Sequence, residues 1–253
     1  MLRGGAVLAA VAVALAAAGC LGAPSRIDHG ALVAKLGPVE ARRTLELRLL
    51  RDPSDLAARL ALAAVCEEAG RPTAAIEQLE AVQTIGGPIG TRWRDEDRAR
   101  LGRLVAARGR ARLARASAFA LADLERGRKL GAAVTDRELA LAGRARAIAQ
   151  LRHVDAKERA AGHRRLRELI GTPAAEPAWT AWATEPRPGP RRGAYGAWLW
   201  SIGARRAAWE ELDAWHAATA PRDPALQAAY LVARAWWVPH DAPPPPPEDL
   251  VGP

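Results

Sequence analysis

Residue types that favour β-sheets are scarce in this chain of 253 residues. Phe and Met occur once each, β-branched residues are sparse, and no segment alternates Val, Ile or Thr with polar residues as a half-buried strand would. Ala, Leu and Arg dominate instead, and these residues favour helices or tolerate them well. The composition therefore argues against strands and predicts an all-α fold.

Motifs of catalysis and metal binding are also missing. The sequence has no HExxH, GxSxG, GxxxxGK[ST] or GxGxxG, and its five histidines lack metal-ligand spacing. One predicted helix carries a potential acid/base cluster, but carboxylates on the outside of an amphipathic helix are usually solvated. We therefore expect no enzyme, cofactor or metal site, with an enzyme assembled from distant residues as an alternative. The cluster comprises Glu210, Glu211, Asp213 and His216.

The first twenty residues have the pattern of an export signal that ends at a cysteine. Arg3 supplies the positive start, an apolar run over 6–18 is too short to span a bilayer, and small residues precede Cys20. The segment resembles the signal peptide and lipobox of bacterial lipoproteins, which implies a body anchored in the cell envelope by an acylated Cys20. An ordinary cleaved signal and an uncleaved anchor are the alternatives, and both also place the body outside the cytoplasm.

Residues next to the expected lipid anchor refine this location. Leu21 stands where Asp marks inner-membrane retention in some bacteria, which favours a periplasm-facing position at the outer membrane. An acylated Cys20 leaves Cys66 as the remaining cysteine, so no intramolecular disulfide can form. Cys66 occupies an apolar helical position, and we expect a small buried side chain there rather than a reactive thiol.

Capping signals and composition divide the chain. Helix starts are indicated by Asp52-Pro53, Thr135 with Glu138, Asp155 and Asp223-Pro224. Helices are predicted near 39–51, 53–69, 72–84, 92–108, 111–129, 136–150, 156–170, 194–218 and 224–238. The expected organisation is a signal peptide (1–20), a tether (21–38), a helical repeat domain (39–171), a Pro-rich linker (172–192), a Trp-rich helical cap (193–238) and a Pro-rich disordered tail (239–253).

One segment resembles a tetratricopeptide repeat, in which two antiparallel helices form a unit that stacks into a solenoid. Leu62 and Ala63 lie eight and seven residues before Gly70, and Ala75 lies five after it. The family places a large residue, a small residue, the turn glycine and a second small residue at these positions. The resemblance implies a TPR-like α-solenoid of antiparallel helix pairs with a Trp-rich helical cap at its C-terminal end.

Two later glycine–arginine pairs repeat this pattern more weakly. Gly109-Arg110 and Gly143-Arg144 follow at spacings close to the family's period of about 34 residues. Gly109 falls between the helices predicted near 92–108 and 111–129, which predicts a turn there, whereas Gly143 falls inside the helix predicted near 136–150. The alternative is a stack of helices without a repeat. A repeat solenoid offers a concave groove to a partner, whereas an irregular bundle promises none.

Positive charge is concentrated in one stretch. The formal net charge is +9, and nearly all of the excess lies in residues 92–169. Such density attracts a polyanion, and for an exported protein an anionic lipid, an acidic cell-wall polymer or an acidic partner protein is expected rather than nucleic acid. A solvated face in an Arg-rich protein is the alternative. The candidate partner-binding arginines are Arg94, Arg98, Arg100, Arg103 and Arg110.

Tryptophans are concentrated at the other end of the chain. Eight of the nine follow residue 172, where large aromatic side chains could fill the core of a small terminal subdomain. The alternative is that some of them are exposed and contact a partner, a glycan or lipid. Trp179 and Trp182, in the predicted linker, are the candidates for such contacts.

Together these features predict a cell-envelope lipoprotein with a TPR-like body that acts as a protein–protein interaction adaptor or assembly factor. It is similar in plan to the tetratricopeptide lipoproteins of pilus, secretion or outer-membrane assembly, a comparison that rests on the signal and the repeat. The expected partners are envelope proteins and, through the anchor, the membrane. The alternative is an envelope-binding module that contacts peptidoglycan, acidic glycan or anionic lipid through Arg and Trp residues.

Overall fold

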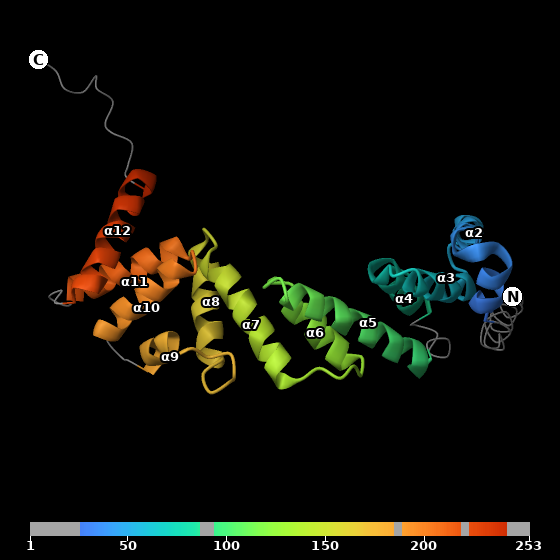
Figure 1. Cartoon of the computed structure of the whole chain (residues 1–253), viewed down its shortest axis with the longest axis horizontal. Helices are drawn as coiled ribbons and strands as arrows, with labels where there is room; N and C mark the ends of the chain where they lie inside the picture. The colour runs from blue at the N-terminus through green and yellow to red at the C-terminus, as the bar shows by residue number, and fades with distance from the viewer. Residues whose placement is uncertain (1–25, 87–93, 185–188, 219–222, 242–253) are drawn as a thin grey trace, which may run out of the picture. The chain divides into compact units, whose positions relative to one another are not determined.

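The structure is a computed structural model that describes residues 26–86, 94–184, 189–218 and 223–241. These ranges contain eleven helices and no strand (Figure 1), which confirms the predicted all-α fold. The predicted signal peptide, Cys20 and residues 242–253 of the predicted tail lie outside the described residues. The helices are α2 (His29–Arg51), α3 (Leu56–Glu68), α4 (Pro72–Gly86), α5 (Asp95–Leu113), α6 (Ala120–Lys129), α7 (Asp136–Leu151), α8 (Ala156–Glu168), α9 (Pro177–Thr184), α10 (Pro190–Ser201), α11 (Arg205–Ala218) and α12 (Pro224–Asp241).

The chain divides into two compact units. Unit 1 comprises the described residues up to 108 together with Arg126–Ala133, and unit 2 comprises Gly109–Glu125 and the described residues from 134 onward. Neighbouring helices pack against one another within each unit: α2 on α3 and α3 on α4 in unit 1, and α7 on α8, α10 on α11 and α11 on α12 in unit 2. This pairwise packing is consistent with the predicted all-α, solenoid-like fold.

The α3/α4 pair has buried residues and a turn at the positions that the sequence pattern indicated. Leu62, Ala63 and Ala75 are buried at the helix contact. Gly70 adopts the left-handed conformation with φ +67° at the turn. The Arg71 N–H donates to the carbonyl of Cys66 at 2.8 Å and closes the end of α3. Large, small, turn and small positions therefore have the predicted roles in this pair.

Neither of the two weaker glycine–arginine pairs marks a turn, so the turn predicted at Gly109 is wrong, whereas the helix predicted across Gly143 is correct. Gly109 lies inside α5, where a Cβ would come within 2.9 Å of the Leu124 side chain, and Gly143 lies inside α7. At Gly109 the lack of a side chain allows two helices to pack closely, and the chain does not change direction there. Gly131, Gly171 and Gly203 have positive φ instead. Gly203 separates α10 from α11, which were expected as one helix over 194–218.

Most predicted helix starts are correct. Thr135 and Glu138 form a capping box, the Asp155 side chain caps α8, and Asp223 accepts from the Ala225 N–H at 2.8 Å. The exception is Asp52, which lies at the C-terminal cap of α2, whereas Asp55 caps α3 by accepting from Ala58.

The N-terminal tether predicted over 21–38 is partly helical. Asp28 accepts from the Ala31 N–H at 3.0 Å, and α2 begins directly after this cap. Gly37 has φ +78° and is followed by Pro38, so α2 is kinked there. The predicted helix near 39–51 is the part of α2 beyond this kink.

The Pro-rich segment predicted as a linker over 172–192 contains α9 and the beginning of α10, so the prediction is wrong for this part. Pro177 begins α9 and Pro190 begins α10. A proline is favourable at a helix start because the N–H that it lacks has no intrahelical partner there. Both helices pack in the interior of unit 2. At the other end, α12 extends through Asp241, three residues into the predicted tail.

Aromatic side chains fill the core of unit 2, as the structural interpretation of the tryptophans predicts. Trp179 and Trp215 are among its largest fully buried side chains. Tyr195 stacks on Trp182 at 4.3 Å between ring centroids. The Tyr195 hydroxyl is 2.9 Å from Nδ1 of His163. Burial raises the Tyr195 pKa, so the phenol stays protonated beside the imidazole.

A left-handed alanine gives a first stability test. Ala116 has φ +50°, and the Ser117 N–H donates to the Arg112 carbonyl, the same closing bond that follows Gly70. Ala116→Gly should raise the free energy of unfolding by about 0.5–1 kcal/mol because glycine adopts this conformation without strain. The matched Gly70→Ala variant should lower it by a similar amount. Urea unfolding midpoints measure both, and a lower midpoint for Ala116→Gly would contradict the explanation.

His163 should make stability depend on pH. Burial, with Arg167, Arg159 and Arg192 nearby, lowers the pKa of His163 to about 4. In the unfolded chain the pKa of a histidine is near 6.5, so between pH 6.5 and pH 4 the unfolded chain binds more protons than the folded protein. The free energy of unfolding therefore falls as the pH drops from about 6.5 to about 4, by at most about 1.4 kcal/mol per pH unit. His163→Phe should flatten this dependence in urea titrations, and the exposed control His153→Asn should retain it. An unchanged slope in His163→Phe would refute the assignment.

Candidate functional site

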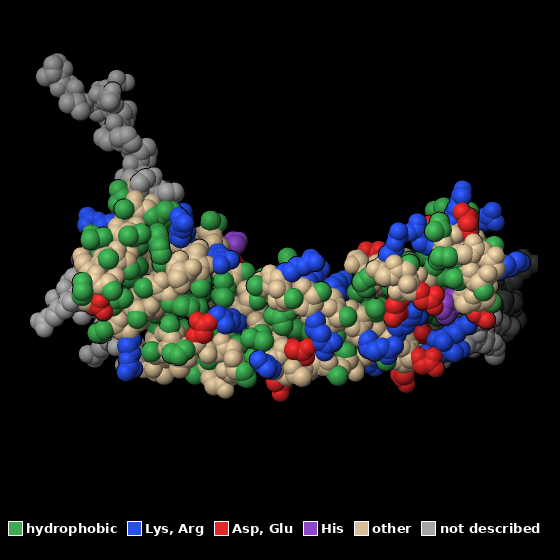
Figure 2. All heavy atoms as spheres, viewed as in Figure 1, with side chains coloured by type: hydrophobic (Ala, Val, Ile, Leu, Met, Phe, Trp, Pro, Cys, Tyr) green, Lys and Arg blue, Asp and Glu red, His purple; other side chains and the backbone are tan. Residues whose placement is uncertain are grey.

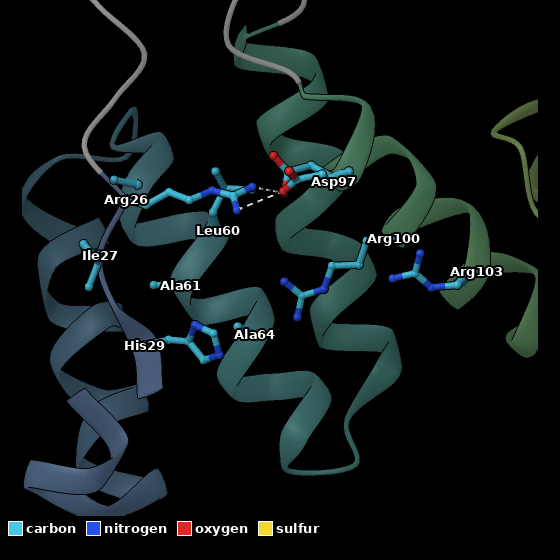
Figure 3. A pocket seen from close by; sticks show the side chains of 11 residues that line it. Arg26, Ile27, His29, Leu60, Ala61, Ala64, Asp97, Arg100 and Arg103 are labelled. Atoms are coloured by element: carbon cyan, nitrogen blue, oxygen red, sulfur yellow. Dashed lines mark hydrogen bonds and ion pairs between the residues drawn. The ribbon is translucent and has the colours of Figure 1, made fainter. Parts of the chain in front are cut away.

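The candidate site is a pocket of about 240 Å³ in unit 1 (Figure 3). One face of α3 forms its floor, the first turns of α5 form one wall, and residues 26–29 form another. Charged and apolar side chains both line it. They are Arg26, Ile27, His29, Ala57, Leu60, Ala61, Ala64, Glu96, Asp97, Arg100 and Arg103.

Small side chains keep the floor of the pocket open. Ala57, Ala61 and Ala64 follow helical spacing along α3, with Leu60 beside them, so all four point to the same side. Alanines leave a hollow where larger side chains would fill the space between α3 and α5. This floor belongs to the helix pair that matches the repeat pattern.

The α5 wall carries two of the arginines identified from the sequence. Nε of Arg100 donates to Glu67 on α3 at 2.6 Å. Arg103, one turn further along α5, is exposed and has no ion-pair partner among the described residues. The guanidinium of Arg103 is therefore available to a carboxylate or phosphate of a partner.

The opposite wall comes from the first described residues. Arg26 donates to Asp97 at 2.8 Å and to Glu96 at 3.2 Å. Asp97 is only 4% exposed, and its Oδ2 has no hydrogen-bond partner among the described residues. His29 Nε2 lies 3.0 Å from Glu68. The Arg26 contact compensates the buried charge of Asp97 and holds this segment over the pocket.

The other predicted arginines do not join this pocket. Arg94 and Arg98 are exposed, and Arg98 donates to the backbone carbonyl of Lys129 at 3.3 Å. Arg110 belongs to unit 2, where its Nε donates to Glu138 at 2.6 Å. That hydrogen bond, with contributions from Thr135, lowers the Glu138 pKa to about 2. Arg110 therefore has a structural ion pair, while Arg100 and Arg103 are the predicted arginines that line the pocket.

The two candidate tryptophans, Trp179 and Trp182, pack mainly against other side chains of unit 2. Trp179 is fully buried in α9, with the ring of Trp198 at 5.3 Å and the Arg144 guanidinium at 5.5 Å. The prediction that Trp179 contacts a partner is therefore wrong. Pro177 begins helix α9, so Trp179 lies in a packed helix and not in an exposed loop. Trp182 is half-buried, and the Arg167 guanidinium lies 4.5 Å from its ring.

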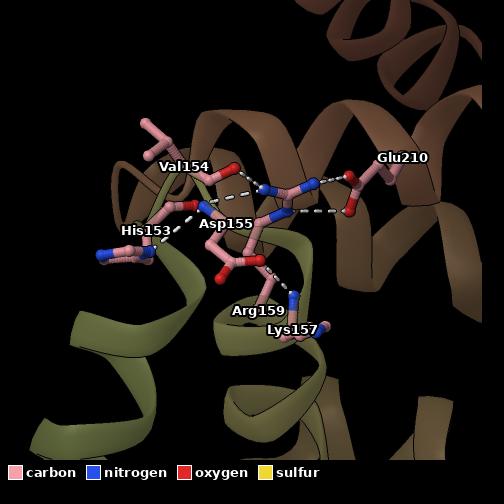
Figure 4. A network of polar contacts seen from close by, with 6 residues as sticks. All are labelled: His153, Val154, Asp155, Lys157, Arg159 and Glu210. Carbon is pink, nitrogen blue, oxygen red and sulfur yellow. Dashed lines mark hydrogen bonds and ion pairs between the residues drawn. The ribbon is translucent and has the colours of Figure 1, made fainter.

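The acidic residues of α11 are less solvated than expected. Glu211 is 7% exposed and accepts from Arg192 at 2.5 Å. Nε and Nη2 of the buried Arg159 guanidinium both donate to the Glu210 carboxylate (Figure 4). Arg159 also donates to the carbonyl of Val154 at 2.6 Å and to that of His153. These contacts tie α8 and the turn before it to α11, so the expected solvated face is wrong for Glu211.

Several other features bear on the kind of site present. Burial raises the pKa of the Cys66 thiol, which keeps it protonated at neutral pH. Across the described ranges, no cluster of three or more His, Cys, Asp or Glu residues could hold a metal, and none of the helices has the length and apolar character needed to cross a membrane. Comparison with protein-family models, curated proteins and solved structures gives no match.

The sequence pattern did not identify some of the residues that line the pocket. Arg26, His29, Glu96 and Asp97 are joined across about 70 or 40 positions of the chain by ion pairs. A charge pattern reports which helix is basic, but it does not report which distant carboxylate a given arginine meets. The sequence therefore indicated α5 and missed the segment that faces it.

The network of Figure 4 gives a further stability prediction. Arg159→Met should lower the free energy of unfolding by about 2 kcal/mol because Glu210 and two backbone carbonyls lose their donor. Arg164→Met, an exposed change on the same helix, should stay within about 0.5 kcal/mol of the wild type. Tryptophan fluorescence during urea unfolding measures both, since eight of the nine tryptophans are in unit 2. Equal effects of the two variants would contradict a structural role specific to Arg159.

Proposed function

We propose that this protein is a cell-envelope lipoprotein, anchored through an acylated Cys20, whose helical body binds another envelope protein as an adaptor or assembly factor. The observation that carries the proposal is the unit 1 pocket, where an alanine floor on a repeat-like helix lies beside Arg100 and Arg103. The export signal supports the location, and the helix pair supports the mode of binding.

The chemistry of the pocket selects one kind of partner segment. Ala57, Ala61 and Ala64 leave room for a small apolar side chain, as in other helical surfaces that receive peptides. Arg103 offers a guanidinium without a partner among the described residues, and Arg100 can exchange its partly exposed Glu67 for another carboxylate. An extended or helical segment with acidic side chains next to a small apolar residue fits these groups best.

The position of the pocket along the chain also favours a partner at the membrane. Arg26 is six positions after Cys20, and six residue steps span at most about 22 Å in a fully extended chain. With an acylated Cys20, the Arg26 side of the pocket is held within that distance of the lipid surface. The proposed partner is therefore a membrane-associated envelope protein.

The alternative, an envelope-binding module, receives less support. It depends on exposed tryptophans as well as arginines, and Trp179 is buried in the core. Acidic side chains also lie among the arginines on the face of unit 1 seen in Figure 2, rather than leaving a purely basic surface. A mixed pocket of this kind favours a protein segment over a uniform polyanion.

Reversing the charge of the two pocket arginines tests the proposed adaptor function. In membranes from cells that produce the full-length chain, Arg100→Glu/Arg103→Glu should reduce recovery of crosslinked envelope partner at least about tenfold, since two like charges then face an acidic segment. Arg51→Glu/Arg137→Glu changes the charge equally at exposed positions outside the pocket and should retain the partner. Equal recovery with both double variants, or no specific partner with the wild type, would refute the adaptor.

The same preparation tests the anchor separately. A clickable fatty acid should label the wild type and both double variants, and Cys20→Ala should abolish the label. A wild type without label would remove the lipid anchor from the proposal while leaving the pocket test valid. Loss of label in Cys20→Ala with unchanged partner binding in detergent would show that the pocket works independently of the anchor.

A further inference from the structure

A second pocket, of about 280 Å³, lies in unit 2 between α7 and the segment that leads into α6. Residues 118–122 line one side of it, residues of α7 and the turn after α7 line the other, and α8 contributes Glu158. Leu121, Leu124 and Ala142 pack together beneath this region and hold α6 against α7. The pocket is therefore built on packed helices of a single unit.

Arg146 brings a positive charge to this pocket. Its side chain is half-buried, and its guanidinium has no hydrogen-bond or ion-pair partner among the described residues. Arg144, two positions earlier on α7, pairs instead with Glu176. A half-buried guanidinium without a counter-charge has all its donors available for an anion, and a carboxylate fits their planar arrangement.

Gln150, one turn after Arg146, adds a hydrogen-bond acceptor that lacks a donor. Its Nε2 donates to Glu158 at 3.1 Å, which fixes the orientation of the amide. Its Oε1 is buried and has no hydrogen-bond partner among the described residues. A buried acceptor without a donor is unfavourable. An N–H group of a ligand in the pocket would supply the missing donor.

His153 and the apolar residues complete the lining. Nδ1 of His153 accepts from the Asp155 N–H at 3.1 Å, so in the neutral ring Nε2 carries the proton, and Nε2 points away from the network of Figure 4. Phe119 is 70% exposed beside the pocket. Small side chains leave room there for an apolar group, which the Phe119 ring can contact. They are Ala118, Ala122 and Ala149.

These groups match the last residue of a peptide chain, which carries a carboxylate, an N–H and a side chain on one Cα. Arg146 and Gln150 are separated by about 6 Å along α7, so both can contact one residue. The volume lies near the lower limit of about 300 Å³ for ligand pockets, which favours a chain end over a continuous segment.

We propose that this pocket binds the carboxyl-terminal residue of a peptide or protein when that residue has an apolar side chain. Arg146 and His153 donate to the carboxylate, and Gln150 accepts from the N–H of the terminal residue. The apolar side chain lies on the alanines beside Phe119. The site belongs to unit 2, so it depends neither on the lipid anchor nor on the unit 1 pocket.

Fluorescence anisotropy of labelled peptides with the full-length chain in mild detergent tests the ligand. The probe is Ser-Gly-Ser-Gly-Ala-Leu with rhodamine at its amino end and a free carboxylate, and its Kd should be about 100 µM. The same peptide with a terminal amide should bind at least about tenfold more weakly, because the charge-assisted hydrogen bonds are lost. A terminal Gly in place of Leu should cost about tenfold as well. Equal binding of the acid and the amide would overturn the proposal.

Variants of α7 assign the contacts. Arg146→Gln should weaken binding of the free acid at least about tenfold. Arg137→Gln removes the same charge at an exposed position of the same helix outside the pocket, and it should bind as the wild type does. Equal affinities of these two variants would contradict the assigned carboxylate contact and overturn the proposal.

The role of Gln150 is tested by combining a protein change with a peptide change. Gln150→Met should weaken binding of the probe about fivefold, whereas a peptide whose last residue is N-methylated should bind Gln150→Met and the wild type equally. A loss of the same size for both peptides would mean that Gln150 only supports the shape of the pocket, and would overturn its contact with the terminal N–H.

Two competitors decide between a chain end and other anions. Inorganic phosphate at about 1 mM should leave the probe bound, and an amidated peptide with Asp in its middle should compete at least about tenfold more weakly than the free acid. Displacement by phosphate would indicate a general anion site. Equal competition by the internal Asp would indicate a site for acidic segments, and either result would overturn the proposal.

Discussion

Close approach of helices through alanine and glycine is the constraint on which the rest of this structure depends. A Cβ on Gly162 would lie 2.9 Å from the carbonyl of Ala147, and one on Gly196 would lie 2.7 Å from Leu212. Helices at this separation gain many backbone contacts, but each residue buries little apolar area. The protein compensates in two ways: with long arginines that bridge neighbouring helices and with tryptophans that fill the remaining space in unit 2.

The arginines explain how a basic sequence folds around a core of small residues. Arg100, Arg159 and Arg192 each reach a glutamate on another helix. A guanidinium on a long side chain can span the surface of two closely packed helices and donate several hydrogen bonds at once. Part of the positive charge is therefore structural, and the arginine without such a partner in the pocket, Arg103, carries the functional proposal.

Features of this protein that depend on residues close in the sequence were predicted better than features that depend on contacts between helices. Thr135 with Glu138 and Gly70 with Ala75 act over a few residues, and their roles were predicted correctly. Gly109 was misjudged because a glycine at a turn and a glycine at a helix contact look the same in a sequence. The approach of Leu124 distinguishes them, and that contact exists only after the helices pack.

By itself, the sequence determined the all-α class and the main helix caps, because these depend on residues that are neighbours in the chain. Only the tertiary structure decided that Trp179 is core, that residues 26–29 face α5, and that residues 118–122 face one side of α7. Those outcomes depend on which distant surfaces meet. Local propensity does not encode that choice, since the same side chain can be buried, paired or exposed according to what packs against it.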